Sequence, residues 1–218
     1  MTDSVEARKS DIIEDIPDGD CVLIVGPALV RINANSVFLR AASGPFRAMF
    51  KPEWREGDEL RARTDPIEIA LPEDDAVAMQ LLCAVIHHQN DSIPRELPIP
   101  TVLAIAVTAD KYDCIRALRF ASELWLRSRR GEVSDMLVLA AAAYLFENAT
   151  AFRDITKKII LSHNGPFSAV YCGEAETIMD NRVFGESQTQ AKHVLPHIAD
   201  SLVPQACWKR REALPGSN

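Results

Sequence analysis

The sequence has no uninterrupted stretch of about 18 apolar residues, which is the length a helix needs to cross a membrane. Its first residues are charged where a signal peptide would be apolar. We therefore expect a protein that has no membrane partner and resides in the cytoplasm, the nucleus or both.

Cysteine is scarce and badly placed for disulfides or zinc. The five cysteines are odd in number, widely spread and free of any C-x-x-C pair: Cys21, Cys83, Cys114, Cys172 and Cys207. A disulfide framework needs paired cysteines, and structural zinc sites usually contain close pairs. We expect reduced thiols in the core of an intracellular protein.

Positive charge is also in short supply. The chain has 24 Lys and Arg against 31 Asp and Glu, a formal net charge of −7. A surface that neutralises nucleic-acid phosphates must be rich in Lys and Arg. This balance argues against direct binding to nucleic acid.

Catalytic and cofactor motifs are missing. The sequence contains no G-x-S-x-G elbow, no G-x-G-x-x-G and no G-x-x-x-x-G-K-[ST]. His193 and His197 have the i, i+4 spacing of zinc ligands, but Val194 stands where a zinc protease has Glu, and no third ligand is recognisable. We expect no metal, no cofactor and no enzymatic activity. A helical enzyme with a polar pocket near its histidines is the less favoured alternative.

What the sequence does contain is an alternation of short strands and helices. Apolar, β-branched runs bounded by turn signals predict strands at residues 21–25, 29–33 and 67–71. The first two are close enough in sequence to form a hairpin. Residues 51–66 are highly charged, which predicts a loop. Together these features predict an α+β fold with a small sheet.

The most informative stretch is residues 33–50. Its spacing places Leu39, Ser43, Phe46 and Phe50 on one helical face, but Ser43-Gly44-Pro45 interrupts the run. Ser43 is suited to cap a new helix, and Pro45 is tolerated in a first turn. The stretch therefore predicts two short helices in succession.

Further helices are predicted downstream. Asp74 or Asp75 is suited to cap a helix that ends at His87, and another begins after Pro100. Residues 114–130 read as one more helix. Beyond Gly131 the sequence is helical throughout, and Ser134-Asp135 and Thr150 are the expected caps of an antiparallel helical hairpin.

Two motifs resemble the BTB/POZ family. The family pattern L-x3-S-x2-F-x3-F is matched by Leu39, Ser43, Phe46 and Phe50, and an A-x-K-Y element is matched by Ala109, Lys111 and Tyr112. With Asp20 before the first strand, the resemblance runs from about residue 20 to residue 126. The family often has His at the position of Asn35, which can still cap the first helix.

The resemblance implies a BTB/POZ fold, in which a small β-sheet is flanked by a cluster of helices. We accordingly divide the chain into an acidic N-terminal arm at residues 1–18, a BTB domain at 19–130 and an all-α extension at 131–214 that resembles a BACK segment. The chain as a whole resembles the short BTB proteins of filamentous fungi.

Two interaction surfaces are predicted. In BTB domains the helix after the second strand is part of a homodimer interface, which makes candidates of Val37, Phe38, Arg40 and Met49. The alternative is that Phe38 packs within one subunit, against the arm or the C-terminal helices.

Trp54 and Glu56 resemble the cullin-docking motif of ubiquitin-ligase adaptors, in which a large side chain fills an apolar pocket. The alternative is that Trp54 covers the domain's own core.

The leading functional hypothesis is a dimerising protein–protein interaction module, acting as a substrate adaptor or scaffold for a cullin-RING ubiquitin ligase. Recognition of a target protein, whose identity the sequence does not give, would fall to residues 132–214 or to the arm. The alternative is a transcriptional or chromatin regulator that acts through partner proteins, since the chain has no zinc-finger spacing.

Overall fold

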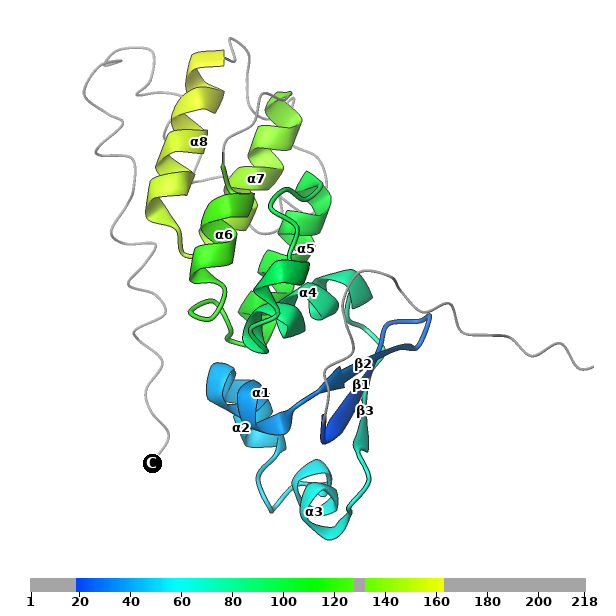
Figure 1. The fold of residues 1–218 in the computed structure, drawn as a ribbon. Helices are drawn as coiled ribbons and strands as arrows, with labels where there is room; N and C mark the ends of the chain where they lie inside the picture. The colour runs from blue at the N-terminus through cyan, green and yellow to red at the C-terminus, as the bar shows by residue number, and fades with distance from the viewer. Residues whose placement is uncertain (1–18, 128–131, 163–218) are drawn as a thin grey trace, which may run out of the picture. The chain divides into compact units, whose positions relative to one another are not determined.

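A computed structural model describes residues 19–127 and 132–162, which form three strands and eight α-helices (Figure 1). This confirms the predicted α+β class. Within these residues, no helix has the length and apolar character that crossing a membrane requires. The predictions for residues 1–18 and for the chain beyond residue 162 lie outside the described residues.

The described residues divide into two compact units. The first contains residues 19–95 and 111–118, and the second contains residues 96–110, 119–127 and 132–162. The chain therefore leaves the first unit, returns to it for one short segment, and leaves it again. This division differs from the sequence-based one, which placed all of residues 19–130 in one domain.

The sheet lies in the first unit and has the order β2-β1-β3. β1 (Cys21–Val25) pairs antiparallel with β2 (Val30–Ala34), as the short connection predicts, and parallel with β3 (Ile67–Leu71). β1 is buried along almost its whole length because it is central, whereas β3 alternates between buried and exposed residues. The turn after β1 uses Gly26 at a φ of 70°, which glycine adopts without steric cost.

Two short helices follow β2, as predicted. Asn35 caps α1 (Ser36–Ala42) by accepting the amide of Val37, and Ser43 caps α2 (Gly44–Met49) by accepting the amide of Phe46 at 3.1 Å. Each cap satisfies a backbone donor that has no acceptor inside its own helix. The interruption at Ser43 therefore ends one helix and begins the next.

The predicted loop at residues 51–66 is wrong over half its length, because it contains α3 (Arg55–Ala62). Glu56 and Asp58 lie in its first turn and Arg61 in its last, an order that complements the helix dipole. Gly57 is buried so close to the preceding turn that a Cβ atom there would lie 2.0 Å from the carbonyl oxygen of Lys51. The sequence of α3 has no apolar stripe, so its pattern did not predict a helix.

α4 (Ala76–Ile86) follows β3 and is almost entirely buried. Its cap is Asp75, one of the two predicted residues, whose carboxylate accepts the amide of Ala78 at 2.7 Å. The helix ends with His88 at a φ of 61° and with the amide of Gln89 bonded back to the carbonyl of Ala84. A short 3₁₀ turn, Asn90–Ser92, comes next.

The second unit is helical. It contains most of α5 (Ile99–Lys111), then α6 (Arg119–Trp125), α7 (Val133–Leu145) and α8 (Ala149–Ser162). α7 and α8 pack side by side as the expected hairpin (Figure 1). The single helix predicted over residues 114–130 is wrong, since residues 114–118 form turns before α6.

The predicted caps of the hairpin are also wrong. α7 begins at Val133 after Glu132, which makes no side-chain capping bond. The Asn148 side chain, not that of Thr150, accepts the amide of Ala151 at the start of α8. Asn148 comes directly after the turn that ends α7, so its amide bonds back to α7 while its side chain caps α8.

Candidate interaction surfaces

The residues of the two BTB-like motifs are mostly interior. Leu39, Ser43, Phe46 and Ala109 are fully buried, and Phe50 and Tyr112 nearly so. Within the first unit, Ser43 and Phe46 of the first motif contact Tyr112 of the second. The Ser43 hydroxyl donates to the carbonyl oxygen of Tyr112 at 2.6 Å, and the rings of Phe46 and Tyr112 stack with centroids 4.7 Å apart. Segments 69 positions apart in sequence are thereby joined.

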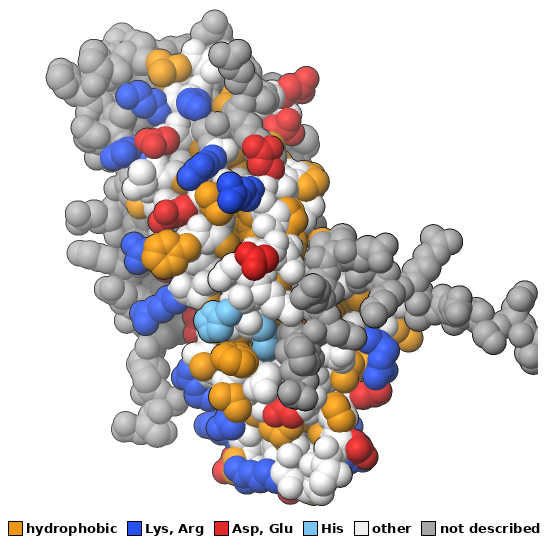
Figure 2. All heavy atoms as spheres, in the orientation of Figure 1, with side chains coloured by type: hydrophobic (Ala, Val, Ile, Leu, Met, Phe, Trp, Pro, Cys, Tyr) orange, Lys and Arg blue, Asp and Glu red, His pale blue; other side chains and the backbone are white. Residues whose placement is uncertain are grey.

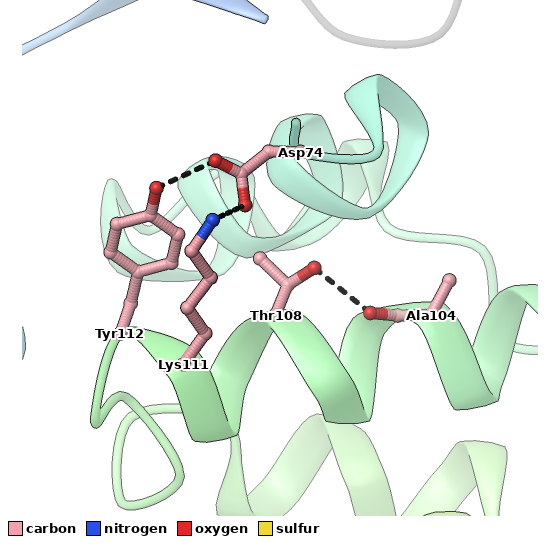
Figure 3. Close-up of polar contacts among 5 residues, drawn as sticks. All are labelled: Asp74, Ala104, Thr108, Lys111 and Tyr112. Carbon is pink, nitrogen blue, oxygen red and sulfur yellow. Dashed lines mark hydrogen bonds and ion pairs between the residues drawn. The ribbon is translucent and has the colours of Figure 1, made fainter. Parts of the chain in front are cut away.

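Tyr112 and Lys111 also hold a buried carboxylate (Figure 3). The Tyr112 hydroxyl donates to Asp74 Oδ2 and the Lys111 ammonium to Asp74 Oδ1, both at 2.8 Å. Burial, and then the neighbouring Asp74 carboxylate, raise the pKa of Tyr112. The phenol therefore stays a hydrogen-bond donor at neutral pH and connects the returning segment to the start of α4.

The predicted dimer residues form what we call the α1–α2 face: Val37, Phe38, Arg40 and Met49. Val37 is 64% exposed and Phe38 is 41% exposed, whereas Leu39 between them and Arg40 is completely buried. Arg40 is exposed and Met49 is half-buried. The structure thus separates the core-facing residue of α1 from two exposed apolar neighbours.

Phe38 has neighbours that the sequence did not suggest. Its ring meets the rings of His87 and His88 edge to face, with centroids 5.4 and 5.7 Å apart. His87 is half-buried and His88 is exposed. In Figure 2 the histidine side chains, in pale blue, lie beside hydrophobic ones. His87 also accepts the amide of Asn35 at Nε2, at 2.9 Å. Adjacency in sequence gave no sign that these histidines contact α1.

Trp54 lies immediately before α3 and is 59% exposed, so it does not cover the core of its own unit. Glu56, in the first turn of α3, pairs with Arg55 at 3.1 Å. The Arg55 side chain is 73% exposed and that of Glu56 is 22% exposed, and an ion pair whose cation is this open to water contributes little. The carboxylate of Glu56 can therefore exchange this partner for another.

The thiols of the described residues are buried. Burial is the largest cause of a raised thiol pKa at all three positions. The pKa of Cys83 is raised to about 12 and that of Cys114 to about 11, and the pKa of Cys21 is also raised. A thiol is a poor nucleophile unless it is deprotonated and accessible. No group of three potential metal ligands occurs within residues 19–127 and 132–162. His193 and His197 lie outside them.

Comparison with models of known protein families found no match, and no curated protein sequence matches the chain.

Proposed function

We propose that this chain is a protein–protein interaction module of the BTB/POZ type, which forms a symmetric homodimer through the α1–α2 face and uses Trp54 and Glu56 to dock a cullin. The resemblance of two sequence motifs supplies the family. The structure adds support, because Ser43 and Phe46 of the first motif contact Tyr112 of the second. Contact between residues of the two motifs is what we expect if both belong to one fold of this type.

The observation that carries the dimer proposal is the exposure of Val37 and Phe38. These adjacent apolar side chains project from a short helix whose other large apolar residue, Leu39, is buried in the core. Exposed apolar clusters of this kind mark contact sites. A two-fold axis beside α1 would bring the same cluster of both copies together, as a symmetric interface requires.

The test replaces Phe38 with Asp. Burying an unpaired carboxylate in the interface should prevent association, while the folded monomer keeps the new charge in water. Light scattering should show half the mass of the wild type, with an unchanged circular dichroism spectrum. Phe120→Asp is the matched control, since Phe120 is 82% exposed on α6 and should not alter the mass. An unchanged mass for Phe38→Asp refutes the placement of the interface.

The cullin proposal rests on Trp54 and Glu56. An exposed indole beside a carboxylate matches a pocket that is apolar at its centre and bears donors at its edge. Calorimetric titration with the N-terminal domain of a cullin should show binding by the wild type and none by the Trp54→Ala/Glu56→Ala variant. The melting temperature should barely change, because Trp54 is mostly exposed. No binding by the wild type overturns the cullin proposal and leaves the dimer proposal intact.

A further inference from the structure

The imidazole of His87 is fixed between two backbone groups from different elements. Its Nε2 lies 2.9 Å from the amide nitrogen of Asn35, and its Nδ1 lies 2.8 Å from the carbonyl oxygen of Cys83. An amide N–H only donates and a carbonyl only accepts. Nε2 must therefore accept and Nδ1 must carry the proton, which defines a neutral ring in a single tautomer.

Protonation is incompatible with this arrangement. A proton on Nε2 would point at the N–H of Asn35, so that two donors would face each other and neither would have an acceptor. Asn35 is the residue that caps α1, and Phe38 lies one turn further along the same helix, against the His87 ring. The contact of α1 with the end of α4 therefore includes a hydrogen bond that only the neutral ring of His87 can accept.

We propose that His87 is a pH-sensitive latch: its neutral ring holds the start of α1 on the end of α4, and its protonation releases α1 together with Phe38. In its consequence for assembly the inference rests on the proposed dimer, since release of Phe38 disturbs the α1–α2 face. The latch itself does not depend on dimer formation.

Two titratable side chains act on His87. The carboxylate of Asp20 favours the charged ring, but Asp20 is held by the backbone amide and the hydroxyl of Ser36 at 2.6 Å each. His88, beside it on the end of α4, disfavours a second positive charge. Burial lowers the pKa of His87 more than the Cys83 carbonyl and the Asp20 carboxylate raise it.

The sign of the pH effect follows from this. Well above pH 6.5, the ordinary pKa of histidine, the ring is neutral in the folded and the unfolded chain, and His87 contributes no pH dependence. Below pH 6.5 the unfolded chain binds a proton that the latched state does not bind. The ratio of folded to unfolded protein then falls by up to about tenfold per pH unit, until the folded pKa is reached.

The experiment is a pH titration of the intact wild-type chain from 7.5 to 5.5, followed by ¹⁵N NMR. A long-range ¹H–¹⁵N spectrum at pH 7.5 should show His87 protonated at Nδ1 only. The Asn35 amide should then shift in step with protonation of the His87 ring. A ring that titrates while the Asn35 amide stays constant overturns the latch.

Variants separate the latch from general acid effects. The urea midpoint of His87→Gln should be constant between pH 7.5 and 5.5, whereas wild type and the control His88→Gln should lose stability. Loss of the effect in His88→Gln instead overturns the assignment to His87. Sedimentation of the wild type should show the dimer dissociating over the same pH range. A chain that is monomeric at pH 7.5 refutes the proposed dimer and the release of assembly by pH, while the Asn35 amide still decides the latch.

Discussion

Replacing Tyr112 with Phe removes one hydroxyl and leaves the ring stacked on Phe46. That hydroxyl donates to Asp74 Oδ2 at 2.8 Å, and both residues are more than 90% buried. A hydrogen bond to a charged acceptor contributes about 1.5–3 kcal/mol, and losing this donor leaves a largely buried carboxylate oxygen without its partner. We expect Tyr112→Phe to lower the free energy of unfolding by about 2 kcal/mol.

The matched control is Lys111→Met, which removes the other partner of the same carboxylate. The Lys111 side chain is 49% exposed, so water can take the place of its ammonium group at Asp74 Oδ1. A partly solvated ion pair contributes about 0.5–1 kcal/mol. The loss should therefore be smaller than for Tyr112→Phe by about 1 kcal/mol.

Urea unfolding at pH 7, followed by circular dichroism, measures both losses. The midpoints should fall while the denaturant slope stays the same, because neither change alters the surface exposed on unfolding. A loss for Lys111→Met equal to or greater than that for Tyr112→Phe would falsify the reasoning. It would mean that the charge, and not the buried hydrogen bond, holds the returning segment.

Three further substitutions test the packing. Gly57→Ala should lower the free energy of unfolding by about 3 kcal/mol, since its Cβ would lie 2.0 Å from the backbone oxygen of Lys51. The control Gly44→Ala should lower it by less than about 1 kcal/mol, since its Cβ would meet only the flexible carboxylate of Asp113 at 3.1 Å. Thr156→Val should be neutral or stabilising by up to about 1 kcal/mol, because the buried hydroxyl of Thr156 has no hydrogen-bond partner within the described residues. Urea midpoints check all three, and equal losses for the two glycine variants, or a destabilised Thr156→Val, contradict these expectations.

Much of the first unit could be predicted because its signals are local. The strand at Cys21–Val25 is a continuous apolar run between turns, and Ser43 and Asp75 are short polar residues placed where helices begin. A capping side chain contacts a backbone amide only two or three residues away. Such contacts can be inferred from spacing alone.

α3 shows where this approach failed. Its residues are charged, so no apolar stripe marked the helix, and Trp54 at its start is exposed instead of buried. The usable signal was electrostatic: acidic residues in the first turn and Arg61 in the last. The parallel pairing of β1 with β3 was not predicted either, because it depends on how the intervening helices return the chain.

The role of His87 was missed for a different reason. Its acceptor bond joins it to Asn35, 52 positions earlier, and no spacing rule connects residues that far apart. The contact that His87 and His88 share with Phe38 depends on the packing of α1 on α4. The sequence shows that a histidine is present, but only the tertiary structure shows that Asn35 and Phe38 are its partners.

Sedimentation equilibrium of the intact wild-type chain at pH 7.5 tests the central claim most directly. Since the α1–α2 face leaves Val37 and Phe38 uncovered in one subunit, we predict a dimer of twice the chain mass of 24.1 kDa across the micromolar range. A monomer at every concentration would contradict the account, because the exposed apolar residues of α1 would then have no second copy to cover them.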